Sequence, residues 1–291
     1  MIAPSARELA PVLAAGGPIL DGQPVDIGID PAARYPDVCS HRLKLGLLLP
    51  ATNCSMEHEL WSLIVRNQQT GLAGIGIHTT NVVTPSPRFG NAEELAAYRD
   101  QFLAGLAEAV PVAALAAPDH VILGMSIEHI VAGLADVRAP ADAVAAAGQR
   151  GVSAWDVAAD QALKRLNARR IALLTPFDAT GNANATRMFR ELGYEVVASF
   201  GFACALARHI AHIPDWAKEK AIMQHLAPPG APVDAIVQCG TNMSMIQVAE
   251  RLEPVIGRPI LGINAGLLWH ALRHNGITAP ISGGGMLLQH A

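Results

Sequence analysis

Two parts of this sequence repeat each other, and the repeat limits the folds open to the chain. The segments LGLLLPATN (45–53) and IALLTPFDA (171–179) are both apolar, strand-like runs in which a proline follows at the same point. Further along, DHVILGMS (119–126) and DAIVQCGT (234–241) form a second matching pair at a similar separation. A repeated pair of strands predicts two related lobes that face each other across a cleft.

Short apolar runs alternate with Ala-rich stretches of helical period from residue 43 onward, a pattern typical of parallel strands joined by crossover helices. The predicted strands are 45–49, 74–79, 121–123, 171–174, 195–200, 236–238 and 260–263. The predicted helices are 56–69, 92–109, 155–166, 182–192, 216–225 and 245–253, with caps at Ser55, Asn91, Ser153 and Thr241. The fold class is therefore α/β, with two pseudo-symmetric, flavodoxin-like lobes. Each lobe is a parallel sheet flanked by helices, and the active site lies in the cleft between them.

The repeat also divides the chain. Residues 1–42 are rich in Pro, Gly and Asp without a sustained period, which indicates an irregular N-terminal arm. Residues 43–152 form the predicted first lobe, onto which a C-terminal segment can pack back, and residues 153–291 form the second.

Composition excludes several classes of function. The chain has 291 residues and a net charge of -4 without a basic run, which argues against a nucleic-acid partner. Its N-terminal apolar stretch is too short and too interrupted for a membrane segment, so we expect no membrane partner. The 51% hydrophobic share against 16% charged residues indicates a surface that is either sparse in charge or partly buried in a homo-oligomer. Four widely spaced cysteines suggest reduced thiols in the cytoplasm.

The repeat also aligns the candidate site residues. Superposing its halves places Gly124 opposite Cys239 and Ser126 opposite Thr241, each pair at the carboxyl end of a strand. Cys239 precedes a turn into a helix, where backbone N–H groups and the helix dipole stabilise a thiolate or a carboxylate. Cys239 is therefore the main catalytic candidate, and a small carboxylate is the predicted substrate.

The sequence resembles the aspartate/glutamate racemase superfamily, in the branch of the maleate isomerases and arylmalonate decarboxylases. The resemblance covers residue 43 to the C-terminus. It rests on PATNCSMEHEL (50–60), IVQCGTN (236–242), GRPILGINAGLLWHAL (257–272) and ITAPISGGGMLL (277–288), in this order.

The resemblance implies a cofactor-independent enzyme. Racemases and isomerases of this superfamily use two cysteines, one on each wall of the cleft. Gly124 stands where the first thiol is expected, which resembles the one-cysteine arrangement of the arylmalonate decarboxylases. In that chemistry Cys239 would protonate the enediolate left after carbon dioxide is expelled. Phe177 replaces a tyrosine that the family commonly has there.

The remaining site residues follow from the same resemblance. Ser126, Thr241 and the backbone N–H of Gly240 would bind the anion, while Asn53 and the Cys54 turn would hold a substrate carboxylate. Gly124, Met125 and Phe177 complete the predicted substrate-binding set.

Several alternatives stay open. Glu128 is a further catalytic candidate, in an acid/base pair or a Ser-His-Glu set, whereas we interpret its neighbour His129 as a surface or interface residue. Cys54 or Glu128 could supply the second group for a maleate-type isomerase or a racemase. A hydrolase, or a carboxylate-binding protein that has lost the first thiol, is the third hypothesis. Cys39 and Cys204 are interpreted as structural, and the histidine spacing predicts no metal site.

Overall fold

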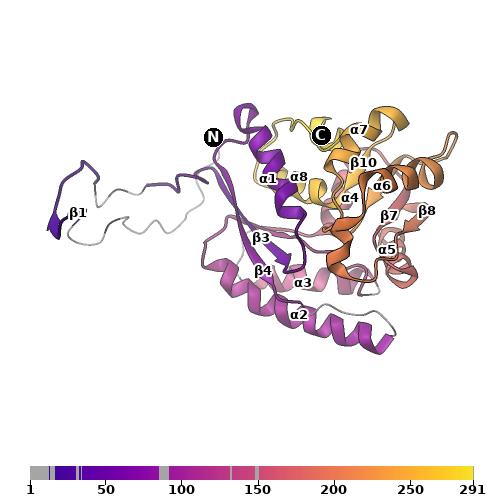
Figure 1. Ribbon diagram of the computed structural model, residues 1–291, viewed down its shortest axis with the longest axis horizontal. Coiled ribbons are helices and arrows are strands. Elements are labelled where there is room, and N and C mark those ends of the chain that lie inside the picture. Colours follow the sequence, from indigo (N-terminus) through magenta and orange to yellow (C-terminus); the bar gives the residue numbers. More distant parts are fainter. Residues whose placement is uncertain are drawn as a thin grey trace.

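The computed structural model describes residues 13, 17–30, 33, 35–84, 92–131, 133–147 and 151–290. The body holds two four-stranded parallel sheets with helices around them (Figure 1). In the N-terminal arm, β1 (Ile19–Leu20) pairs antiparallel with β2 (Gln23–Pro24), and this exposed hairpin stands away from the body. The predicted helix cap Asn91 lies outside the described residues.

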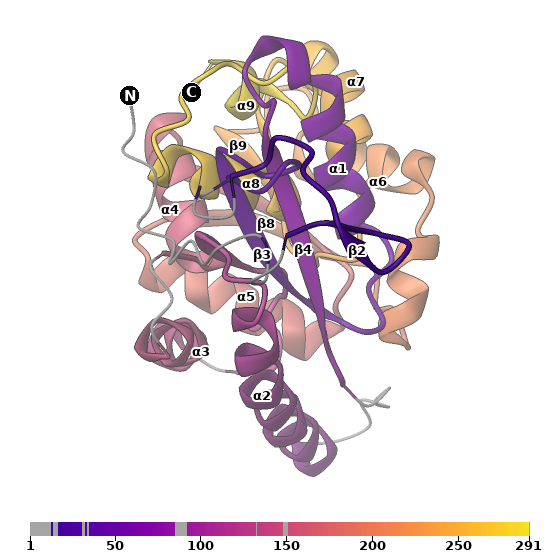
Figure 2. The same ribbon diagram turned by 90° about the vertical axis from the view of Figure 1, so that its left-hand side faces the viewer.

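The first sheet has the strand order β4-β3-β5-β6. Its strands are β3 (Leu43–Pro50), β4 (Ile75–Val82), β5 (His120–Leu123) and β6 (Val152–Ser153). Its helical segments are α1 (Met56–Arg66), η1 (Gln68–Thr70), α2 (Ala92–Ala114), α3 (Leu134–Ala146) and α4 (Trp155–Arg165). All of β5 and most of β3 are buried, as expected of a central strand covered on both faces. Figure 2 shows β3 and β4 in front, with α2 and α3 below them.

The second sheet has the strand order β10-β9-β7-β8. Its strands are β7 (Arg170–Thr175), β8 (Glu195–Gly201), β9 (Ala235–Gln238) and β10 (Ile260–Gly262). Its helical segments are α5 (Ala179–Glu191), η2 (Ala207–His212), α6 (Asp215–Ala221), η3 (Ile222–Leu226), α7 (Ile246–Ile256), α8 (Ile263–His274) and α9 (Met286–His290).

The two sheets have the same topology. Numbered within its own half, each sheet runs in the order 2-1-3-4, with β3 and β7 as the first strands. The register agrees as well, because Leu48 pairs with Leu123 in the first sheet and Leu174 pairs with Gln238 in the second. The predicted α/β fold with two related parallel sheets is therefore confirmed.

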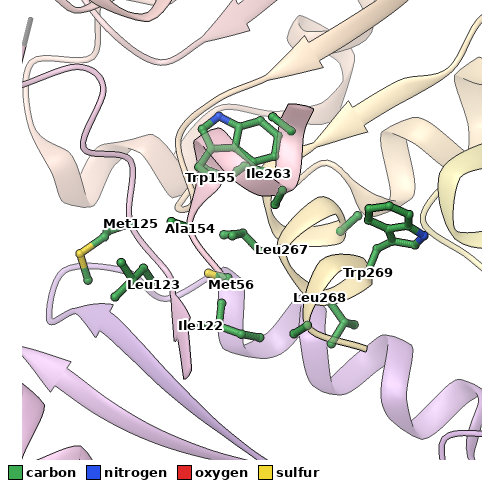
Figure 3. Close-up of a cluster of buried hydrophobic side chains, with 14 of the residues drawn as sticks. Met56, Ile122, Leu123, Met125, Ala154, Trp155, Ile263, Leu267, Leu268 and Trp269 are labelled. Atoms are coloured by element: carbon green, nitrogen blue, oxygen red, sulfur yellow. The ribbon is translucent and has the colours of Figure 1, made fainter. Parts of the chain in front are cut away.

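One hydrophobic core joins the two sheets. It contains residues of β3 and β5 together with residues of β7 and β9, and helices α4 and α8 pack against each other within it. Figure 3 shows Met56 of α1, Ile122 of β5, Trp155 of α4 and Leu267 of α8 gathered in this cluster. A second, smaller core fills the space between the second sheet and the helices α6 and α7. Helix α8 follows β10 in the chain yet contacts β5 and β6, so the C-terminal part covers the first sheet.

All seven predicted strands are present, but two of the predicted helix caps are wrong. Ser153 lies in β6 rather than capping a helix, and Ala154 takes the cap position of α4. Thr241 does not cap a helix, since α7 begins at Ile246. Helices α3 and α8 were not predicted, because Ala-rich and uniformly apolar segments have no clear polar face. The predicted boundary between residues 152 and 153 falls inside β6, and the division into domains stays a prediction.

Two buried histidines and a buried serine form a cluster between β5, β6 and α8, with the exposed His274 beside it. Nε2 of His120 lies 2.7 Å from Oγ of Ser153, and that oxygen lies 2.6 Å from Nδ1 of His270. The ring centroids of His120 and His274 are 5.0 Å apart. Burial lowers the pKa of His120 to about 3 and that of His270 to about 4, so both rings are neutral in the folded protein at neutral pH.

We expect this cluster to make the protein acid-labile. Below pH ~6.5 the unfolded chain protonates both histidines while the folded chain does not. The free energy of unfolding should therefore fall as the pH decreases from about 6.5 toward 4, by on the order of 1 kcal/mol per pH unit for each ring. Urea denaturation across this range measures the slope. The H120Q/H270Q double variant should flatten it, whereas H58Q, on an exposed part of α1, should not. Equal slopes in all three proteins would contradict this prediction.

Candidate active site

A cavity of about 280 Å³ lies at the carboxyl ends of β3, β5, β7 and β9. The turns after these four strands all contribute to its wall, so both sheets build one site, as the topology of open α/β sheets requires. Residues of α2 and of the segment around η2 complete the wall. The lining residues are Pro50, Thr52, Asn53, Tyr98, Phe102, Met125, Ser126, His129, Pro176, Phe177, Asp178, Thr180, Gly181, Cys204, Ala207, Ile210, Gly240, Thr241 and Asn242.

The cavity wall is mostly apolar and offers neutral hydrogen-bonding groups. Among the lining residues that the structure describes, none is a lysine or an arginine. Asp178 lines the cavity, but its Oδ1 accepts a 2.8 Å hydrogen bond from the Gly181 N–H and so caps α5. An anionic substrate would therefore be held by hydroxyl, amide and backbone N–H groups rather than by a cation.

Gly124 and Cys239 occupy equivalent positions in the two sheets. The N–H of Gly124 donates to the Leu48 carbonyl at 2.8 Å, and the N–H of Cys239 donates to the Leu174 carbonyl at 3.0 Å. A Cβ atom at position 124 would lie 2.8 Å from Leu47, 2.9 Å from the Met56 sulfur and 3.0 Å from the Leu48 carbonyl. A side chain at position 124 would therefore have to displace the ends of the Leu47 and Met56 side chains, and glycine leaves this strand end without a thiol.

The Cys239 side chain is fully buried and does not line the cavity. Burial raises its pKa well above the usual value, and the nearby Glu128 carboxyl raises it further, so the thiol is protonated at neutral pH. The indole of Trp155 lies beside the same thiol. Gly240, the next residue in the chain, does line the cavity, so the thiol lies one residue behind the wall.

Glu128 is also buried, with 1% of its side chain exposed. Desolvation raises its pKa to about 7, although the Cys239 thiol and the Ser126 hydroxyl both contact the carboxyl and oppose this rise. Neither carboxyl oxygen has a hydrogen bond of good geometry to any part of the chain that the structure describes. The structure thus brings together the three predicted catalytic residues, with Ser126 alone at the cavity surface.

Several hydrogen bonds join the halves of the site, and two of them connect predicted site residues. Oγ of Ser126 accepts the Gly240 N–H at 2.8 Å, and Nδ2 of Asn53 donates to Oγ of Thr241 at 2.9 Å. The backbone N–H predicted to bind the anion is therefore already used by Ser126. Gly240 has a φ of +94°, and a Cβ there would come within 2.6 Å of Pro176, so only glycine fits at this position.

A buried carboxyl supports the Thr241 turn from behind. Oε1 of Glu59 accepts the N–H groups of Met245 and Ile246 at 2.8 and 3.0 Å, and Oε2 accepts Nδ2 of Asn264 at 2.7 Å. The same Asn264 amide donates to the Thr241 carbonyl at 3.0 Å. The first lobe thereby fixes the turn in the second lobe that faces the cavity. Glu59 belongs to the PATNCSMEHEL motif, but the sequence offered no sign that it would reach the other lobe.

The position of His129 differs from the predicted one. It is not a surface residue but lines the cavity, with its ring stacked on Phe177 at a centroid distance of 4.5 Å. Nδ1 of His129 lies 2.5 Å from the Ser126 carbonyl, and burial lowers its pKa to about 4. Of the Glu128–His129 pair, the histidine therefore faces the cavity and the glutamate faces the buried thiol.

The other cysteines also differ from their predicted places. Cys204 lines the cavity, whereas we had interpreted it as structural, and burial raises its pKa. Its position after β8 was the available signal, since carboxyl ends of parallel strands meet at one edge. Cys54 is exposed and does not line the cavity, although its N–H donates to Oδ1 of Asn242 at 3.0 Å. Cys39 is exposed as well.

Two further observations concern metal ions and membranes. In the described part of the chain, no group of three or more His, Cys, Asp or Glu side chains is arranged to hold a metal ion. No helix there combines the length and apolar character that crossing a membrane requires.

These observations define a two-lobed α/β fold with one small cavity where the strand ends of both lobes meet. Solved structures with this fold include maleate isomerases and arylmalonate decarboxylases, so the predicted resemblance is confirmed at the level of the fold. No family model and no curated protein sequence matches the chain.

The structural similarity extends over most of the chain. The maleate cis-trans isomerase of Nocardia farcinica, in a variant with a bound succinylcysteine intermediate, superposes with a TM-score of 0.71 at 22% identity, covering 86% of this chain and 99% of that one. The maleate isomerase of Pseudomonas putida S16 gives 0.73 at 17% identity, covering 85% and 98%. An arylmalonate decarboxylase gives 0.64 at 16% identity, covering 84% and 98%. All three neighbours are enzymes.

Proposed function

We propose that this protein is a cofactor-independent enzyme that decarboxylates a small malonate-type acid, with Cys239 as the acid that protonates the enediolate. The observation that carries the proposal is the asymmetry of the two strand ends. Cys239 provides a protonated thiol beside a buried carboxyl, whereas its counterpart Gly124 has no side chain that could donate a proton.

The asymmetry favours decarboxylation over racemisation. Racemisation needs a proton-transfer group on each face of the reacting carbon, and isomerisation through two thiols likewise needs one on each wall. Decarboxylation generates its own carbanion by releasing carbon dioxide, so a single acid suffices. Cys54, which we had considered as a second thiol, does not line the cavity.

The character of the cavity supports the same reaction. A malonate-type substrate carries two negative charges, and its decarboxylation removes one of them as neutral carbon dioxide. An apolar wall without a cation among its described residues disfavours the dianion relative to the transition state. Thr241 and Asn53 can hold the remaining carboxylate with neutral donors, and the volume of about 280 Å³ limits the substrate to a small acid.

One observation favours a second candidate, a maleate-type cis-trans isomerase. Cys204 lines the cavity, so the site contains a thiol besides the buried Cys239. That thiol could attack a double bond from the side of β8, while Cys239 supplies a proton. The same assay distinguishes the two candidates.

We expect the purified protein to convert phenylmalonate into phenylacetate and not to convert maleate into fumarate. Proton NMR in D₂O follows both reactions, and the phenylacetate should carry one solvent deuterium at the α carbon. A malonate with two different substituents should give one enantiomer in excess, because a single acid protonates one face. Fumarate formation without decarboxylation would support the isomerase instead. A folded sample inactive on both substrates would refute both candidates.

A further inference from the structure

Glu128 has no role in the proposed decarboxylation, yet its side chain lies in an unusual environment for a carboxyl group. Its carboxyl is buried, and neither oxygen has a well-formed hydrogen bond to any described group. Leaving a buried polar group unsatisfied costs free energy, so such a group calls for an explanation in function. The Cys239 thiol and the Ser126 hydroxyl are the two proton-bearing side chains in contact with it.

The surroundings favour the protonated form of this carboxyl more than those of an exposed glutamate would. Desolvation raises its pKa to about 7, and the charge of Asp156 at the start of α4 adds to the effect. Oδ2 of Asp156 accepts a 2.9 Å hydrogen bond from Nε of Arg138, and the next residue, His129, is neutral because burial lowers its pKa to about 4. No cation is in contact with the Glu128 carboxyl among the described residues. Near pH 7 the carboxyl is therefore poised between its protonated and ionised forms.

We propose that Glu128 is a positioning residue that returns a proton to Cys239 after each turnover, with the Ser126 hydroxyl linking it to the cavity. This inference rests on the proposed decarboxylation. It gives the buried carboxyl a defined role, and it supplies a route by which the fully buried Cys239 thiol regains its proton between turnovers.

The proton balance closes over one cycle. The C–C bond to one carboxylate breaks and carbon dioxide leaves, and its bonding electron pair forms the enediolate of the remaining carboxylate. The Cys239 S–H bond then breaks as a C–H bond forms at the α carbon, leaving a thiolate. Glu128 transfers its proton to this thiolate and becomes a carboxylate. Finally, the Ser126 hydroxyl passes its proton to Glu128 and takes one from water in the emptied cavity, so each turnover consumes one proton from solvent.

The placement of Ser126 makes the last step feasible. Its hydroxyl contacts Glu128 on one side and lines the cavity on the other. Its oxygen accepts the Gly240 N–H at 2.8 Å, which leaves the hydroxyl hydrogen available for the carboxyl. The thiol itself is fully buried one residue behind Gly240, so it meets the substrate at the cavity wall but has no direct contact with bulk solvent.

The test is the Glu128→Gln variant in a rapid-quench assay with phenylmalonate. Its first turnover should keep a rate close to that of the wild type, because Cys239 already carries its proton. Later turnovers should slow by at least 10²-fold, which gives a burst of about one product per protein. Glu128→Asp keeps an acid at this position and should restore most of the multiple-turnover rate. Glu253→Gln is the matched control, since Glu253 is another buried carboxyl with a pKa near 7 and does not line the cavity.

A second readout does not depend on turnover. The absorbance of thiolate near 240 nm, titrated against a Cys239→Ala reference, reports the pKa of Cys239. Glu128→Gln should lower that pKa, because the neighbouring carboxyl raises it. Thermal unfolding confirms that each variant is folded.

The outcomes separate the two proposals. An active wild type together with an unchanged steady-state rate in Glu128→Gln would overturn the relay alone. A first turnover slowed as much as later ones, without a burst, would also overturn it, because Glu128 would then act before or during protonation. A wild type that releases no carbon dioxide would refute the proposed decarboxylation and the relay with it.

Discussion

Replacing Cys239 by alanine is expected to lower kcat for phenylmalonate by roughly 10²- to 10⁴-fold, the range in which a positioned acid contributes to catalysis. KM should change little, because the thiol is buried behind the cavity wall and does not hold the substrate. Carbon dioxide release under saturating substrate measures kcat. The effect is large because no other thiol occupies the equivalent strand end, where Gly124 stands.

The control is Cys39→Ala, which removes an exposed thiol outside the cavity and should leave kcat unchanged. Alanine at position 239 also creates a small buried void, so urea denaturation should accompany the assay. A folded Cys239→Ala protein with undiminished kcat would show that the proton comes from another group. In that case the cavity-lining Cys204 would be the next candidate.

Glu59→Ala is expected to produce the largest loss of stability, about 3–5 kcal/mol in the free energy of unfolding. The substitution orphans the N–H groups of Met245 and Ile246 and the amide of Asn264, all of which are buried. Each unsatisfied donor costs roughly 1–3 kcal/mol, and the start of α7 also loses a carboxyl acceptor at its N-terminus. Urea denaturation at pH 7.5 measures the change.

Glu57→Ala provides a close comparison, because Glu57 lies two residues away on α1 and is exposed. Surface substitutions of this kind usually stay within about 0.5 kcal/mol. The kinetic constants of the two variants should differ as well, since Asn264, which Glu59 binds, also donates to the Thr241 carbonyl. We expect Glu59→Ala to raise KM even at temperatures at which the variant is folded. Equal stability of the two variants would contradict the bridging role of Glu59.

The sequence was sufficient to predict seven of the eight strands in the two parallel sheets, their parallel arrangement and the pairing of the two halves, while the two-residue strand β6 was missed. Buried parallel strands are short apolar runs, and the repeat aligned Leu48 with Leu174, so Gly124 and Cys239 fell at the same position. Ser126, Glu128 and Cys239 were correctly grouped as neighbours, because residues that follow the central strands meet at one edge of the fold.

The errors have specific physical causes. We judged Glu128 and His129 by helical geometry, but this segment forms turns, so the pattern could not show which of them faces the cavity. Cys239 was expected at the cavity surface, and its burial depends on packing against Trp155 and Glu128, which are distant in sequence. The contact of Glu59 with the start of α7 crosses between lobes, and no local pattern encodes such a contact.

The core that runs from one sheet to the other through α4 and α8 makes the two repeats inseparable. Each half forms a complete sheet with the same strand order, as an independently folding domain would. Yet helix α8, which belongs to the second half by sequence, provides apolar cover for β5 and β6 of the first. A gene fragment encoding either repeat alone would therefore expose the face that the other normally shields. The two halves therefore share one backbone symmetry, but neither has a complete hydrophobic core of its own.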